Sequence, residues 1–146
     1  MDELRLTAKL EVLSSIGAFV LKAAENAGLD RRAAYRLRLA VDEMATNVIV
    51  HGNPLEHSGD DEIRLTSEMN DQGLMITLED RGPEFNPLEH ETPEGHIDKP
   101  MEQRPIGGLG VFLAIRGVDR FLYERVGDRN RSTFIVNRGA PAENRS

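Results

Sequence analysis

Apolar residues in the first third of the chain recur at intervals of three and four, the spacing of one face of an α-helix. They predict a first helix from Val12 to about Ala27, with Gly28 in the position of a C-cap glycine. Asp30 is a suitable N-cap for a second helix, which ends near residues 51–54. One narrow stripe of this second helix carries Leu37, Val41, Met44 and Val48. We expect that stripe to be buried against a sheet.

Alternation of apolar and polar residues predicts five strands. They cover residues 4–10, 62–69, 74–80, 119–126 and 131–138. The last four form two predicted hairpins, around the turn-rich sequences of residues 70–73 and 127–130. Between the hairpins, residues 86–106 carry four prolines and predict a long loop, and a third helix begins at the glycines that follow.

The order of these elements is strand, helix, helix, hairpin, loop, helix, hairpin. It predicts an α+β fold, a two-layer sandwich in which a mixed, mostly antiparallel sheet is covered on one face by three helices. A doubly wound βαβ order and a Walker phosphate-binding motif are both missing from the sequence, which disfavours the commonest nucleotide folds. We expect one domain over residues 1–139 and a polar tail over 140–146.

Composition and charge exclude several kinds of site. The 146 residues include no cysteine, so disulfides and thiolate metal sites are excluded, and the four histidines lack metal-ligand spacing. The net charge of −7 and the lack of a basic cluster argue against nucleic-acid binding. No apolar run approaches the roughly 18 to 20 residues that span a bilayer, and the acidic start does not resemble a secretory signal. We therefore expect a cytoplasmic protein that does not bind a membrane.

The second helix carries an acid and an amide, Glu43 and Asn47, one turn apart beside its apolar stripe. A carboxylate next to apolar packing is costly unless something uses it. An amide oxygen is a suitable ligand for Mg²⁺, and a nearby carboxylate can deprotonate an attacking hydroxyl. Taken alone, the same spacing is more typical of an ordinary solvated helix edge.

A second motif, Asp80-Arg81-Gly82-Pro83-Glu84-Phe85, ends the first hairpin. Strand alternation turns Asp80 toward the core, where its carboxylate needs a donor such as the amino group of adenine. Gly82 lets the chain turn away close to a flat ring. By itself the motif is more typical of a strand-end Asp that bonds its own turn.

The third motif, Ile106-Gly107-Gly108-Leu109-Gly110-Val111-Phe112, places glycines where a loop enters a helix. Exposed backbone N–H groups and the helix dipole can bind phosphates at such a point. The alternative is simply a tight turn.

The three motifs in this order resemble the ATP-binding domain shared by histidine kinases, type II topoisomerases, Hsp90 chaperones and MutL proteins. The length and the sequence Thr46-Asn47-Val48-Ile49-Val50-His51-Gly52 resemble the bacterial anti-sigma-factor serine kinases, and the resemblance runs from about Leu4 to Val136. It implies a Bergerat-type sandwich, ATP with Mg²⁺, and phosphorylation of a serine or threonine on a STAS-domain antagonist. It also implies a homodimer and a sigma factor or similar regulatory partner.

Carried onto this sequence, the resemblance makes Glu43 the catalytic base and Asn47 the Mg²⁺ ligand. Asp80 would accept from the adenine amine and Gly82 would allow the ring to approach, with Phe85 in the same motif.

In the third motif Gly108 and Gly110 would line the phosphates, together with Leu109. Thr133 matches a hydroxyl residue that family members place near adenine on the last hairpin. Some members have an arginine just before the glycine motif, where this chain has Ile106-Gly107. Lys99 and Arg104 are the basic residues of the loop and are the candidate γ-phosphate contacts.

The leading hypothesis is therefore a protein serine/threonine kinase. The alternative is an ATP-binding regulator that sequesters its partner without phosphotransfer, and a third hypothesis is a scaffold that has lost nucleotide. A sensor histidine kinase is disfavoured because no phosphoacceptor histidine lies in the first 50 residues. We also expect residues 86–106 to form a lid that is ordered by nucleotide, and the first strand and helix to form the dimer contact.

Overall fold

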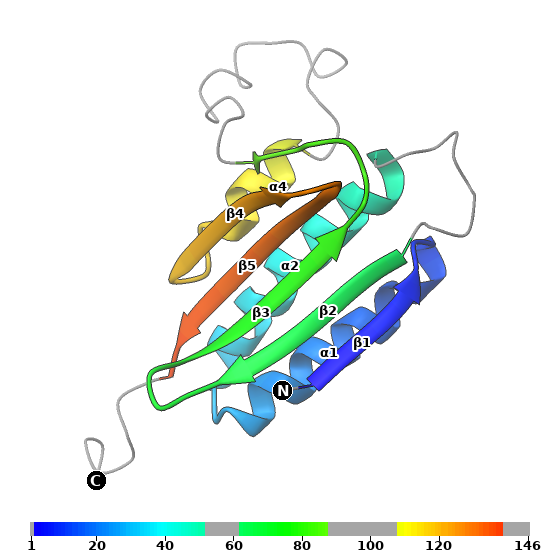
Figure 1. Ribbon diagram of the computed structural model, residues 1–146. Coiled ribbons are helices and arrows are strands. Elements are labelled where there is room, and N and C mark those ends of the chain that lie inside the picture. Colours follow the sequence, from blue (N-terminus) through cyan, green and yellow to red (C-terminus); the bar gives the residue numbers. More distant parts are fainter. Residues whose placement is uncertain (1, 52–61, 88–107, 139–146) are drawn as a thin grey trace, which may run out of the picture.

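Helices cover one face of a five-stranded sheet in the computed structural model, which describes residues 2–51, 62–87 and 108–138 (Figure 1). The predicted order of elements is confirmed, whereas most of the predicted loop lies outside the described residues. The elements are β1 (Asp2–Thr7), a 3-10 turn η1 (Leu10–Val12), α1 (Leu13–Asn26), α2 (Arg31–His51), β2 (Glu62–Met69), β3 (Gly73–Asp80), α4 (Gly108–Ile115), β4 (Arg120–Val126) and β5 (Arg129–Asn137).

The strand order is β1-β2-β3-β5-β4, and the four pairings among the described strands are all antiparallel. The strand β1 ends at Thr7, earlier than predicted, because its partner β2 begins at Glu62, directly opposite Thr7. The second hairpin is tighter than predicted, since Arg129 and Asn130 already belong to β5. Gly127 supplies the left-handed backbone of that turn, with a φ of 63°.

The ends of the first two helices follow their sequence signals. Gly28 has a φ of 76°, and its N–H donates to the carbonyl of Glu25 as α1 ends. Asp30 caps α2, because its Oδ1 accepts the N–H of Ala33 at 2.7 Å. The cap fixes where α2 begins. The buried stripe fixes which face of α2 meets the sheet, and hence where its polar residues lie.

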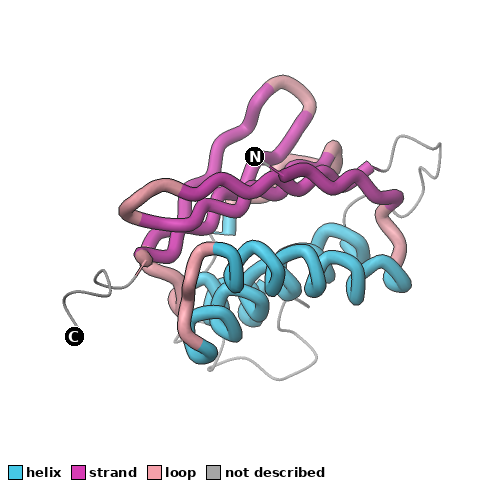
Figure 2. The backbone as a smooth tube through the Cα atoms, turned by 90° about the horizontal axis from the view of Figure 1, so that it is seen from below, coloured by secondary structure: helices cyan, strands magenta, loops and turns pink. Residues whose placement is uncertain are grey.

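The core lies between the helices and the sheet (Figure 2). Three of the four residues in the predicted α2 stripe are buried, Leu37 and Val41 fully and Met44 with 2% exposed, whereas Val48 is half-buried. From the sheet, alternate residues of β3 point into the same core, and Phe134 of β5 packs edge-on against Phe121 with ring centroids 5.2 Å apart. None of the helices in the described ranges combines the length and apolar composition needed to cross a bilayer.

Candidate active site

The Glu43 side chain lies against the first turn of α4. A Cβ atom added to Gly110 would be 2.7 Å from Glu43 Oε1, closer than real Cβ contacts come. Because glycine has no Cβ atom, position 110 has room for the Glu43 carboxylate. The N-terminal end of a helix is its positive end, so the start of α4 is a favourable place for a negative group.

Asn47 lies one turn further along α2 on the same side and is buried, with 7% of its surface exposed, while Glu43 is half-buried. Neither side chain forms a hydrogen bond or salt bridge with another residue of the described ranges. Their oxygens are therefore available to a ligand. An amide oxygen and a carboxylate are hard donors, and they fit Mg²⁺, which takes few protein ligands and completes its shell with water and phosphate oxygens.

Asp80 ends β3 with its side chain turned into the core, as predicted, and is 6% exposed. Its Oδ2 accepts the Gly82 N–H at 2.8 Å and the Asn130 side-chain amide at 3.2 Å. Burial raises the pKa of Asp80 above its usual 3.8, although these two hydrogen bonds and the nearby Arg125 act in the opposite direction. The hydrogen bond from Gly82 forms the strand-end turn that is the alternative interpretation of this motif. It uses one of the two carboxylate oxygens of Asp80.

Asn130 holds the turn that follows Asp80, a role that the sequence analysis missed. Its Oδ1 accepts from Tyr123 Oη at 2.5 Å, from Arg125 Nη1 at 3.2 Å and from the Phe85 N–H at 3.2 Å. Its Nδ2 donates to the Pro83 carbonyl at 2.8 Å as well as to Asp80. In sequence it lies in a turn-rich segment and looks like a turn residue. The pairing of β3 with β5 is what places it opposite Asp80.

The hydroxyl on the Asp80 face of β5 is Ser132, not Thr133. Residues directly opposite one another in an antiparallel pair share a face. Asn130 is opposite Asp80, so Ser132 is on that face and Thr133 is on the other, where its hydroxyl lies 3.5 Å from that of Thr77. The structure thus does not bring Thr133 to the other candidate residues, whereas Ser132, 3% exposed, was not among them.

The remaining candidates are placed as follows. The C-terminal ends of α2 and β3 lie at the same end of the molecule, with α4 beside them (Figure 1). Phe85 is half-buried against the core, and Gly108 and Leu109 open α4. Lys99 and Arg104 lie outside the described residues.

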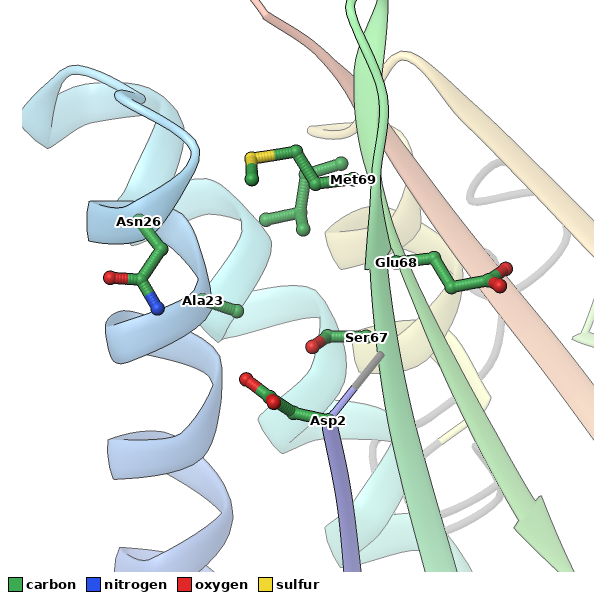
Figure 3. Close-up of a pocket in the computed structure, with 7 residues that line it drawn as sticks. Asp2, Ala23, Asn26, Ser67, Glu68 and Met69 are labelled. Carbon is green, nitrogen blue, oxygen red and sulfur yellow. The ribbon is translucent and has the colours of Figure 1, made fainter.

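A pocket of about 170 Å³ lies elsewhere, between α1 and the start of β1 (Figure 3). Figure 3 shows Asp2 and Ser67 directed into it and Glu68 directed to the other side of the sheet. Leu74 lines this pocket near the beginning of β3, roughly 20 Å along the strand from Asp80 at about 3.3 Å per residue. It is therefore separate from the candidate site.

Comparison with known proteins gives consistent matches. The family model of the histidine kinase-like ATPase domain matches residues 6–136. The chain is 32% identical over 118 residues to the serine-protein kinase RsbW of Listeria innocua, covering 75% of this chain and 70% of the relative. It is 28% identical over 113 residues to the serine-protein kinase RsbW of Oceanobacillus iheyensis, covering 76% and 70%.

Two solved structures share the fold. The crystal structure of the RsbU and RsbW domains of a Mycobacterium tuberculosis protein aligns with a TM-score of 0.62 at 16% identity, over 96% of this chain and 34% of that one. The histidine kinase domain of a blue-light activated kinase from Erythrobacter litoralis aligns with a TM-score of 0.52 at 20% identity, over 88% and 60%.

Proposed function

Because the chain belongs to the histidine kinase-like ATPase family, and within it to the group of the RsbW serine-protein kinases, we propose that it is an ATP-dependent protein serine/threonine kinase. Its proposed substrate is a STAS-domain antagonist protein, and its further proposed partner is a sigma factor or a similar regulator. The observation that carries the proposal is the position of Glu43 against Gly110 at the start of α4, one turn from Asn47.

The described geometry supports the following proposed nucleotide contacts. The buried Asp80 carboxylate accepts a hydrogen bond from the adenine amino group through the oxygen that the turn does not use, and Gly82 allows the ring to approach. Gly108 and Gly110 line the phosphates at the N-terminal end of α4. Asn47 is the proposed Mg²⁺ ligand, and Mg²⁺ supplies positive charge beside the transferred phosphoryl group.

Glu43 is the proposed general base. It accepts the proton of the acceptor hydroxyl while that oxygen forms its bond to the γ-phosphorus, and the bond from that phosphorus to the bridging oxygen breaks to release ADP. Binding of adenine and phosphate alone requires no base at this position, so Glu43 favours a kinase over a regulator that only sequesters its partner.

The kinase proposal is tested by incubating the purified protein with labelled ATP and the STAS-domain proteins of its own genome. We expect one labelled acceptor. Glu43→Gln preserves shape but removes the base, so we expect phosphotransfer to fall by about 10² to 10⁴ while ATP still binds. Asp42→Asn is the matched control, since it makes the same acid-to-amide change at the neighbouring position and should leave transfer within about threefold.

Three results would decide against this assignment. Transfer by Glu43→Gln at the parent rate would reject Glu43 as the base. A parent protein that binds ATP and an antagonist but labels nothing would instead favour the sequestering regulator. No change in thermal midpoint with ATP and Mg²⁺ would reject nucleotide binding itself.

We further propose a homodimer that uses β1 and α1. The strand β1 is an edge of the sheet, with β2 on one side, and an exposed edge strand can pair with another chain. A monomeric mass by light scattering at micromolar concentration, with and without ATP, would contradict this.

A further inference from the structure

The outer surface of the N-terminal half of α2 combines positive charge with exposed apolar groups. It consists of Arg31, Arg32, Tyr35, Arg36 and Leu39, all of them exposed, and we call it the α2 basic surface. Tyr35 is 61% exposed and Leu39 is 39% exposed, and they lie one turn apart on the same side of the helix. An aromatic ring among arginines is a combination found at the centres of protein interfaces.

The charge of this surface is opposite to that of the chain, whose net charge is −7. Arg38, on the flank of the helix, is held by Asp42 at 3.2 Å. By contrast, Arg31, Arg32 and Arg36 form no salt bridge with any residue of the described ranges. Three guanidinium groups therefore remain available to carboxylates of another molecule.

The α2 basic surface is continuous with the candidate active site. Leu39 precedes Glu43 by one turn, about 6 Å along the helix axis, and is rotated from it by only about 40°. The seam between α2 and α4 joins the two regions as well. A Cβ atom added to Gly117, just beyond the C-terminal end of α4, would lie 3.6 Å from the Arg36 side chain, and Glu43 lies against Gly110 near the N-terminal end of α4. A molecule bound to this surface would lie beside the Glu43 carboxylate.

We propose that the α2 basic surface is the docking site for the protein acceptor, which binds through an acidic surface with an apolar contact for Tyr35 and Leu39 and presents its hydroxyl to Glu43. This inference rests on the proposed kinase function. A second copy of the chain is a poorer occupant, since a two-fold contact through this surface would set arginines against arginines. A phosphate polymer is opposed by the acidic balance of the remaining chain.

The test is the steady-state kinetics of phosphotransfer to the STAS-domain acceptor identified with labelled ATP. We expect Tyr35→Ala/Leu39→Ala to raise the KM for the acceptor at least tenfold, and Arg32→Glu/Arg36→Glu to do the same. The kcat at saturating acceptor and the Kd for ATP should stay within about twofold, since no substituted side chain belongs to the proposed nucleotide site. The KM of the parent should rise with salt, and that of the charge-reversed variant should rise less.

Leu122→Ala and Arg120→Glu on β4 are the matched controls. Leu122 is 45% exposed, close to the value for Leu39, but it lies on the edge strand opposite the one in the proposed dimer contact. We expect both controls to keep the parent KM. A KM that is unchanged in the α2 variants, or raised equally in the β4 controls, would overturn the docking proposal while leaving the kinase intact.

Two other outcomes would also overturn the proposal. If the Tyr35→Ala/Leu39→Ala variant converts a dimer to a monomer by light scattering, the occupant of the surface is a second copy. If the parent binds ATP but labels no acceptor, the kinase function fails, and the docking role fails with it. The ATP titration and the parent reaction are measured first, so that this failure is distinguished from loss of docking alone.

Discussion

Glu79 and Asp80 are neighbours at the end of β3, yet the sheet turns them to opposite faces and gives their carboxyl groups opposite surroundings. Glu79 lies on the face away from the helices, with its side chain 6% exposed. It bonds Arg131 at 2.8 Å and Arg129 at 3.1 Å, and Arg64 lies at 3.5 Å. Burial alone would raise the pKa of Glu79, but these arginines outweigh it and the pKa is lowered from 4.5.

Asp80 is as deeply buried but meets a backbone N–H and an amide instead of a directly bonded cation, and its pKa is raised. The folded structure therefore stabilises the ionised form of Glu79, whereas it disfavours the ionised form of Asp80. A carboxylate kept where the fold does not favour its charge indicates a use outside folding. We therefore expect Glu79 to contribute to stability and Asp80 to bind the proposed ligand, and five substitutions test this.

Asp80→Asn should have the largest effect, a loss of nucleotide affinity. A charge-assisted hydrogen bond to adenine, worth about 1.5 to 3 kcal/mol, is lost, so the Kd for ATP should rise at least tenfold by calorimetry. The amide oxygen can still accept from Gly82 and Asn130, so the free energy of unfolding at pH 7 should not fall. Because the folded protein holds the proton of Asp80 to higher pH than the unfolded chain does, the variant should gain stability relative to the parent as pH rises above about 3.8. A clear loss of stability at pH 7 would make Asp80 a structural residue.

Asn130→Ala should lower both the free energy of unfolding and the affinity for ATP. It removes the bonds to Asp80, to the Pro83 carbonyl and to the Phe85 N–H, so we expect a loss of about 2 kcal/mol in urea unfolding. The turn that positions Asp80 is released, so the Kd for ATP should rise as well. An unchanged Kd would show that the turn does not contribute to the site.

Glu79→Gln should reduce stability and leave ATP binding within about twofold. Its arginine partners are about a third exposed and solvent screens them, so we expect a loss of about 1 kcal/mol. The pKa of Glu79 is lowered on folding, so its contribution is present above pH 4.5 and lost as pH falls. The difference between parent and variant should therefore shrink in urea unfolding at pH 3.5. A difference that persists there would have a cause other than the carboxylate charge.

Ser132→Ala and Thr133→Val test whether the two faces of β5 also differ in their contribution to ATP binding. We expect these two substitutions to have the smallest effects. Ser132 is on the Asp80 face, so we expect its variant to weaken ATP binding by about threefold, the effect of one modest hydrogen bond. Thr133 is on the Glu79 face, and its variant should leave affinity unchanged. The reverse ranking in calorimetry would restore Thr133 as the hydroxyl near adenine.

The local features of this protein could be predicted from the amino-acid sequence. The interval of apolar residues defined the helices and strands, Asp30 and Gly28 marked helix ends, and alternation gave the direction of Asp80. These features depend on residues within a few positions of one another, so a short window of sequence contains the information.

Contacts between residues far apart in the sequence depend on how the strands and helices pack together. The register of β3 with β5 placed Asn130 opposite Asp80 and turned Thr133 away, and the packing of α2 on α4 brought Glu43 to Gly110. A one-residue slip in that register would exchange the two faces of β5, and the short turn-rich segment at 127–130 gives no local signal for it. The burial of the core excludes such a slip, because it would turn Phe134 and Val136 away from the helices and from the apolar face of β3.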